Sequence, residues 1–197
     1  VPILDIAYGD SGSSKLVVAL QANGNKRQVS AAIFQRKRSL MGQGKEEAVG
    51  VFDLTSLIPG RATKVLVPGT GDSVIVVTED GKVSYLLLED EEFKLIQTFA
   101  PFEDIPGAHI QAATFIFGDV SICFASDSGA NRVFSLYYPK GGAERFFGKT
   151  HDFPSLGTKP SFLISTLRNK AFLIGGGSEL SLRYSTTESI RWEGKMP

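Results

Sequence analysis

One stretch of the sequence, Asp72 to Phe99, constrains the fold more than any other. It consists of three apolar runs separated by two short polar turns. The runs are Val74–Val77, Val83–Leu88 and Phe93–Phe99. They are rich in Val, Ile, Tyr and Phe, whose stiff side chains suit a pleated sheet. The stretch therefore predicts three consecutive β-strands.

The two polar turns predict how these strands are paired. Glu79-Asp80-Gly81 contains an Asp-Gly pair, which supplies the positive φ angles of a tight hairpin. Glu89 to Glu92 is a run of four acidic residues that a buried strand would not contain. Both turns favour an antiparallel meander. The preceding run Lys64–Val67, closed by Pro68-Gly69, extends the prediction to four strands.

The same four-stranded pattern recurs along the whole chain, in units of roughly 50 residues that are typical of solenoids and propellers. The approximate units are residues 1–54, 62–100, 109–152 and 159–194. We predict an all-β fold, a β-propeller or propeller-like array of about four four-stranded antiparallel blades within a single domain of residues 1–197. An irregular β-sandwich with evenly spaced strands is the alternative.

Composition excludes some functions. The 197 residues include 21 Lys+Arg and 21 Asp+Glu, so net charge gives no argument for nucleic-acid binding. No apolar run approaches the roughly 18 residues that span a bilayer. The chain begins with Val1 rather than Met and opens on a strand, so we expect a fragment excised from a larger protein. The single cysteine, Cys123, lies in an apolar run and predicts a small buried side chain.

Two groups of basic residues are candidates for anion contacts. Arg36, Lys37 and Arg38 are consecutive within the segment Gln35 to Glu46, and Arg61 follows Pro59-Gly60. Clustered positive charge could contact phosphate. The alternative is a solvated loop between two strands, whose charge Glu46 and Glu47 balance.

The sequence contains no convincing catalytic or metal-binding pattern, so we expect no enzyme, no metal and no cofactor. His109 and His151 lack companion ligands at metal-site spacing. Gly175-Gly176-Gly177 precedes a strand rather than a helix, which favours a turn or bulge over a phosphate loop. A propeller enzyme would need acidic residues converging on a central channel. The residues that could supply them, which turn positions explain equally well, are Asp5, Asp72 and Asp119.

The last third of the chain carries a more specific pattern. His151 to Leu156 is followed by a strand of R-x-K-x-F-L type and a hairpin into a strand ending in Thr-Glu. The matching residues are Arg168, Lys170, Phe172, Leu173, Leu180, Thr187 and Glu188. This segment of about 45 residues resembles the extra-membrane domain inserted in certain bacterial phosphate ABC transporter permease subunits. The permease core of that family is absent here, so the resemblance assigns no transport role to any residue of this sequence.

The resemblance implies a non-catalytic domain on the periplasmic side of the bacterial inner membrane, within an integral membrane protein. It implies contacts with a periplasmic phosphate-binding protein or other transporter subunits during phosphate import. The membrane would be reached through parts of the parent chain. The alternative is a propeller scaffold or sensor unrelated to phosphate transport, although WD-type signatures are missing and the only tryptophan is Trp192, followed by Glu193. Four units could close alone, belong to a larger ring or self-associate; we favour an incomplete ring.

Overall fold

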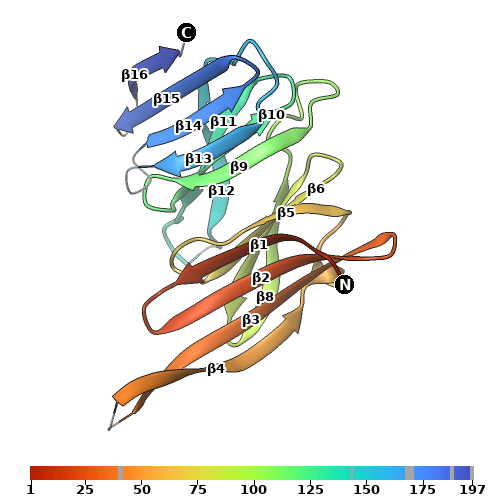
Figure 1. The fold of residues 1–197 in the computed structure, drawn as a ribbon, viewed down its shortest axis with the longest axis vertical. Coiled ribbons are helices and arrows are strands. Elements are labelled where there is room, and N and C mark those ends of the chain that lie inside the picture. The colour runs from red at the N-terminus through yellow and green to blue at the C-terminus, as the bar shows by residue number, and fades with distance from the viewer. Residues whose placement is uncertain (40–41, 143, 167–170, 187–188, 196–197) are drawn as a thin grey trace. The chain divides into compact units, whose positions relative to one another are not determined.

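The chain folds almost entirely into β-strands in a computed structural model (Figure 1). The structure describes the backbone of residues 1–39, 42–142, 144–166, 171–186 and 189–195, and side chains within 1–35, 45–142, 144–165 and 171–183. Sixteen strands form four four-stranded antiparallel sheets. The predicted all-β array of four propeller-type blades is confirmed, and the sandwich alternative is wrong.

Each sheet is one blade, built from four strands that are consecutive in the sequence. Blade 1 contains β1 (Ile3–Asp10), β2 (Ser14–Asn23), β3 (Lys26–Ser39) and β4 (Gly42–Asp53). Blade 2 contains β5 (Ala62–Leu66), β6 (Ser73–Thr78), β7 (Val83–Glu89) and β8 (Glu92–Phe99). Blade 3 contains β9 (Ile110–Ile116), β10 (Ser121–Ser126), β11 (Asn131–Tyr137) and β12 (Phe146–Phe153). Blade 4 contains β13 (Phe162–Thr166), β14 (Ala171–Gly176), β15 (Glu179–Thr186) and β16 (Ser189–Lys195).

The blades are grouped into two compact units, Val1–Phe99 and Ala100–Pro197. In the first unit, blade 1 packs against blade 2. The shared core is apolar and comes from alternate positions of both sheets, in particular Leu16, Val18 and Leu20 of blade 1 and Val65, Val67, Val74 and Val76 of blade 2. The 3-10 helix η1 (Thr55–Leu57) follows blade 1.

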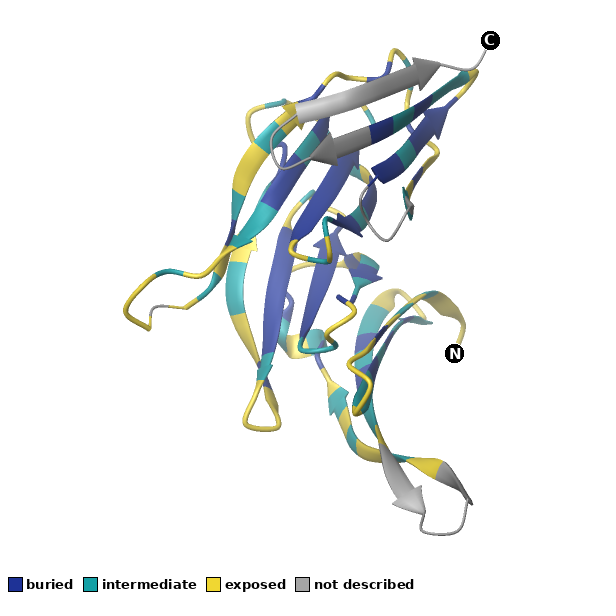
Figure 2. Ribbon diagram, turned by 90° about the vertical axis from the view of Figure 1, so that its left-hand side faces the viewer, coloured by how far each residue is buried: buried dark blue, intermediate teal, exposed yellow. Residues whose placement is uncertain are grey.

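The second unit repeats this arrangement with blades 3 and 4. Its core joins Ile116, Cys123, Ala125 and Val133 of blade 3 to Leu163, Phe172 and Ile174 of blade 4. The ring of Phe172 meets that of Phe153 edge-on at 5.1 Å between centroids. Figure 2 shows the buried residues concentrated along the middle strands of the sheets. Strands β6 and β10 are buried at every position.

Two strand boundaries differ from the predictions. The segment Gln35 to Glu46, predicted as a loop, is largely a long hairpin, because β3 runs to Ser39 and pairs with β4, with Arg36 opposite Glu46. The last strand of blade 3 is Phe146–Phe153, which extends one residue beyond the predicted unit 109–152 and contains His151. Gly148 and the bulge opposite Val133 and Phe134 interrupt the apolar alternation that would have revealed this strand.

The acidic turn between β7 and β8 is strained. Asp90 and Glu91 have φ angles of 51° and 64°, a left-handed conformation that favours Asn and Gly. We expect Asp90→Asn with Glu91→Gly to stabilise the protein by about 1 kcal/mol relative to Asp90→Asn with Glu91→Gln. Both variants carry the same charge, so the difference between their urea midpoints measures the backbone strain at position 91. Equal midpoints would contradict the strain.

Candidate functional site

The most distinctive surface of the first unit is the face of blade 1 that points away from blade 2. Along β1, Asp5, Ala7 and Gly9 face the core, and the side chains of Ile6 and Tyr8 lie on the other side. Ile6 is 60% exposed and Tyr8 is 71% exposed. An edge strand with large exposed apolar residues on one face is a candidate contact surface.

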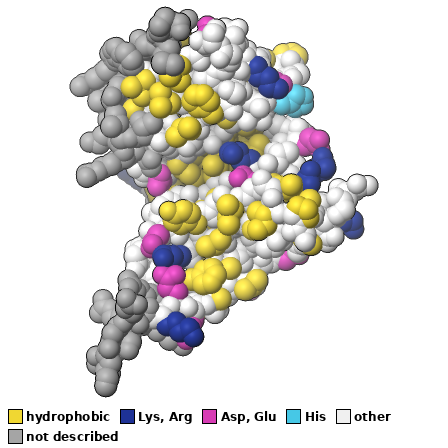
Figure 3. All heavy atoms as spheres, in the orientation of Figure 1, with side chains coloured by type: hydrophobic (Ala, Val, Ile, Leu, Met, Phe, Trp, Pro, Cys, Tyr) yellow, Lys and Arg dark blue, Asp and Glu magenta, His cyan; other side chains and the backbone are white. Residues whose placement is uncertain are grey.

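Neighbouring strands continue this apolar surface across the whole sheet. Tyr8 lies opposite Val17, Val17 opposite Ala32, and Ala32 opposite Val51, which is 75% exposed. The adjacent row contains Ile6 and Ala19. We call the surface formed by these residues the open face of blade 1. In Figure 3 apolar side chains gather over β1, β2 and β3.

This composition is unusual for a sheet face in contact with water. Antiparallel sheets with one solvated face normally alternate apolar and polar residues. In β2, by contrast, the run Leu16-Val17-Val18-Ala19-Leu20 is apolar at every position, although Val17 and Ala19 lie on the open face. Blade 1 therefore has the residue pattern of a sheet with both faces covered.

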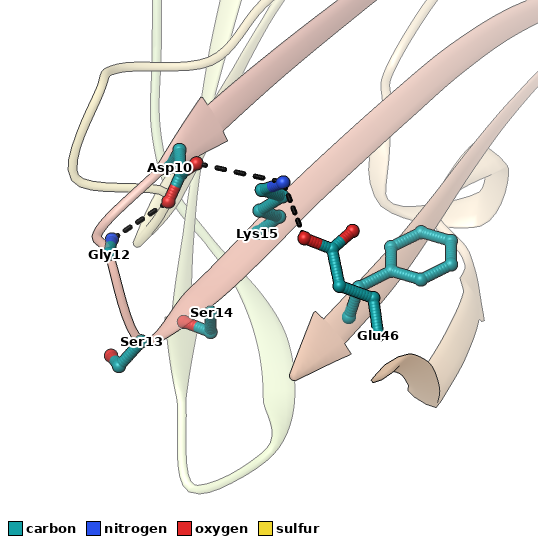
Figure 4. A pocket seen from close by; sticks show the side chains of 7 residues that line it. Asp10, Gly12, Ser13, Ser14, Lys15 and Glu46 are labelled. Carbon is teal, nitrogen blue, oxygen red and sulfur yellow. Dashed lines mark hydrogen bonds and ion pairs between the residues drawn. The ribbon is translucent and has the colours of Figure 1, made fainter. Parts of the chain in front are cut away.

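A polar hollow of ≈ 190 Å³ lies beside the apolar row, at the tip of the β1–β2 hairpin (Figure 4). Its lining residues are Asp10, Gly12, Ser13, Ser14, Lys15, Phe34 and Glu46. The register places it on the open face, because Asp10 is opposite Lys15 and Lys15 is opposite Phe34.

The charges of this hollow satisfy one another. The Lys15 ammonium donates to Glu46 Oε1 at 2.6 Å and lies 3.8 Å from Asp10 Oδ2. The other carboxylate oxygen of Asp10 accepts a hydrogen bond from the Gly12 amide at 2.8 Å. Figure 4 shows Lys15 between the two acids. Exposed ion pairs of this kind add little stability, but they form a polar rim at the edge of an apolar surface.

The predicted anion contacts are only partly visible. Arg61 donates from one guanidinium nitrogen to both carboxylate oxygens of Glu79, at 3.2 and 3.0 Å, so a carboxylate of the same blade pairs with it. Arg36, Lys37 and Arg38 lie on β3, but their side chains are outside the described residues. A phosphate site at these four residues stays a prediction.

The residues considered for metal binding or catalysis have structural roles where the structure describes them. His109 and Asp127 are joined by two hydrogen bonds, one from the His109 amide to Asp127 Oδ1 and one from the Asp127 amide to the His109 carbonyl. The His151 ring packs edge-on against Phe153. Across the described ranges, no three His, Cys, Asp or Glu residues are grouped as a metal site would require.

The three aspartates considered for a central channel also have local structural roles. Asp5 accepts a hydrogen bond from the Val65 amide at 3.0 Å and so connects β1 to β5. Asp72 accepts from the hydroxyls of Thr70 and Ser73. Asp119 occupies a turn with a φ of 67°. Burial raises the pKa of the Cys123 thiol to about 12, so this thiol is not a nucleophile at neutral pH.

The triple glycine lies at the β14–β15 hairpin, with Gly175 and Gly176 in the strand and Gly177 in the turn. β14 ends at Gly176, and Gly177 has a φ of 58°. A Cβ on Gly176 would lie 2.0 Å from the carbonyl oxygen of Lys159, so only glycine permits this approach of two backbones.

Several solved structures share this fold. A candidate 6-phosphogluconolactonase from Bacteroides uniformis aligns with 98% of this chain at a TM-score of 0.62 and 12% identity, over 55% of its own length. A candidate 6-phosphogluconolactonase from Bacteroides fragilis aligns at a TM-score of 0.63 and 9% identity, over 98% of this chain and 55% of its own. A protein of unknown function from Desulfotomaculum acetoxidans aligns at a TM-score of 0.66 and 9% identity, over 96% of this chain and 54% of its own.

The chain has a β-propeller fold. It spans about half the length of these structures, and at 9–12% identity the likeness shows the fold alone. No protein-family model and no curated protein matches the sequence. Two neighbours are named as candidate enzymes, so the expectation that this propeller is not an enzyme stays a prediction.

The assignment to a phosphate permease subunit is wrong. Of the three propellers reported above, two are named as candidate lactonases and none as a transporter. Of the residues behind the assignment, Phe172 is fully buried in the core and Leu180 lies on β15. Arg168, Lys170, Thr187 and Glu188 lie outside the described residues. Alternating apolar residues recur in any blade, so they do not identify a family.

The transporter function and the periplasmic membrane location rested on the same resemblance and are corrected with it. In the part of the chain that the structure describes, no helix is long and apolar enough to cross a membrane. The expected contact with a phosphate-binding protein is not tested by any of these observations. Sequence reasoning missed the open face of blade 1, although the run Val17 to Ala19 carried its signal.

Proposed function

We propose that this propeller is a protein-binding module whose contact surface is the open face of blade 1. The supporting observation is the apolar row from Tyr8 through Val17 and Ala32 to Val51, of which the two outer residues are largely exposed. Exposed apolar surfaces of this kind, bordered by polar residues, mark sites of protein contact. The hollow at Asp10, Lys15 and Glu46 provides such a border.

The test compares proteins retained from a lysate by the wild-type chain and by a Tyr8→Lys variant, using quantitative mass spectrometry. Tyr8 is 71% exposed, so the substitution leaves the core intact. Aromatic residues at interface centres contribute strongly to binding, and we expect retention of the specific partner to fall about 30-fold or more. Val120→Lys is the control, because Val120 is 46% exposed but belongs to blade 3. Equal retention by all three chains would remove the support for this surface.

A second candidate function is hydrolysis of a phosphosugar lactone, which the names of two fold neighbours suggest. The polar hollow at Lys15 is the site that could accommodate such a substrate. Under the protein-binding proposal, the purified chain hydrolyses 6-phosphogluconolactone no faster than buffer does. Hydrolysis above background that a Lys15→Met variant lacks would favour the enzyme.

A further inference from the structure

Blades 2 and 4 share a row of residues on the sheet face that each turns toward the preceding blade of its own unit. The row crosses three neighbouring strands, with an apolar residue on the first strand, another on the second and a serine on the third. Its members are Val65, Val76 and Ser84 in blade 2, and Leu163, Ile174 and Ser181 in blade 4. All six side chains are buried, at 8% exposure or less.

Blade 1 carries the same row on its open face. Ile6 on β1 lies opposite Ala19 on β2, and Ala19 lies opposite Ser30 on β3. The order apolar, apolar, serine therefore recurs on the first three strands of three blades. Exposure is what differs, because Ile6 is 60% exposed, whereas Val65 and Leu163 are 2% and 8% exposed. The open face of blade 1 has the composition of a face that receives another sheet.

The two covered rows show which element such a face receives. In each unit the covering element is an antiparallel sheet, and alternate positions of its strands supply apolar side chains. These side chains include Leu16, Val18 and Leu20 of blade 1, and Cys123 and Ala125 of blade 3. Sheets packed face to face lie about 10 Å apart with their side chains interdigitated. A serine on the third strand is small, so a covering sheet can approach closely there.

We infer that the partner of this module contacts the open face of blade 1 through an antiparallel β-sheet, with apolar side chains from alternate positions packed on Ile6, Ala19 and Ser30. This inference rests on the proposed protein-binding function and names the structural class of the partner. The contacting element is a sheet of another protein rather than a helix, because the molecule covers the same row with a sheet in both of its units.

A steric substitution tests the close approach of this sheet. Ser30→Phe enlarges the apolar surface but places a ring where a covering sheet has to come close. We expect retention of the partner from a lysate, measured by quantitative mass spectrometry, to fall about tenfold or more. Ser30→Ala is the matched control, because it keeps the small size and should retain the partner as the wild type does. Circular dichroism establishes that each variant is folded.

Photo-cross-linking in the same lysate identifies the element that touches the face. The photoreactive residue p-benzoylphenylalanine is placed in the full chain at Tyr8 or Val51, which are 71% and 75% exposed, or at Val120 of blade 3 as the control. Mass spectrometry then locates the cross-linked residues of the partner. In a sheet, residues that share one face alternate along each strand, so we expect cross-links at positions i and i+2. Cross-links spaced by three and four residues would indicate a helix and overturn the inference.

The outcomes separate this inference from the proposed function. If Tyr8→Lys loses the partner but Ser30→Phe retains it as the wild type does, the sheet contact is overturned and the proposed function stands. Cross-links confined to peptides of this chain would also overturn the inference, because the covering sheet would then be its own. If neither Tyr8→Lys nor Ser30→Phe changes retention, and Tyr8 and Val51 cross-link no more than Val120 does, both the inference and the proposed function fail.

Discussion

Gly9→Ala is expected to destabilise the protein by roughly 3 kcal/mol, because the added methyl group meets backbone atoms. A Cβ at Gly9 would lie 2.1 Å from the carbonyl oxygen of Pro68 and 2.9 Å from the Cα of Gly71. Both atoms belong to the backbone of the β5–β6 connection, which a rotamer change cannot move. The contact is relieved only if β1 and this connection separate, and the separation would weaken the hydrogen bond between Asp5 and Val65.

Urea denaturation of Gly9→Ala and Gly12→Ala measures this effect. Gly12 lies in the same hairpin and has a φ of 86°, but a Cβ there meets nothing within 4 Å. Its substitution therefore costs only the backbone strain of a left-handed residue, about 1 kcal/mol. If Gly9→Ala lost no more stability than Gly12→Ala, the two blades would have to separate easily at this point.

Arg132→Met is expected to destabilise the second unit by about 2 kcal/mol and to loosen the segment Pro101–Gly107. The Arg132 side chain is only 11% exposed. Its guanidinium donates to both carboxylate oxygens of Asp104, to Asp152 Oδ1 at 2.9 Å and to the Pro101 carbonyl at 2.8 Å. It also lies over the ring of Phe102, 5.4 Å from the centroid. One side chain thus attaches the connection before β9 to β11 and β12.

Urea denaturation and amide hydrogen exchange measure the two parts of this effect. Lys149→Met is the matched control, because Lys149 pairs with the same Asp152 at 2.7 Å but is 43% exposed. An exposed pair of this kind contributes less than about 1 kcal/mol. Arg132→Lys keeps the charge but not the planar fork, so we expect an intermediate loss. Unchanged exchange in residues 101–107 of Arg132→Met would contradict the attachment.

Acid should release the same segment. The hydrogen bonds from Arg132 lower the pKa of Asp104 from its ordinary value of 3.8 to about 2. A carboxylate with a lowered pKa in the folded state stabilises that state above its unfolded pKa, and the contribution is lost as the pH falls through the folded pKa. We expect amide exchange in residues 101–107, measured relative to the intrinsic exchange rate at each pH, to increase between about pH 4 and pH 2 in the wild type. In Asp104→Asn this increase should be absent, and a wild-type profile in that variant would assign the transition to another group.

The fold was predictable because turn residues and apolar runs alternate clearly. Gly81 has a φ of 77°, and the Thr78 amide donates to the Lys82 carbonyl, so the Asp80-Gly81 pair forms the hairpin that the sequence indicated. The hairpin from Arg36 to Glu46 was not predictable in the same way. Its strands extend with charged residues instead of an apolar alternation, so the period-two signal of a strand is missing there.

The candidate site was less accessible to sequence reasoning. A period of two shows which residues share a face, but it does not show whether another sheet covers that face. Val17 and Val18 are equally apolar, yet Val18 is fully buried against blade 2 and Val17 lies on the open face. The basic run from Arg36 to Arg38 attracted attention because charge is conspicuous in a sequence, whereas exposure is a property of the folded chain.

The meander of each blade has a consequence for how the chain folds. Every strand pairs only with strands adjacent to it in the sequence, so the hydrogen bonds of one sheet close short loops. Loop-closure entropy grows with the length of chain enclosed, and proteins dominated by short-range pairs fold faster than β-proteins with distant pairings. Each blade can therefore acquire its register independently as it leaves the ribosome. Only the packing of one blade on the next has to wait for the following segment.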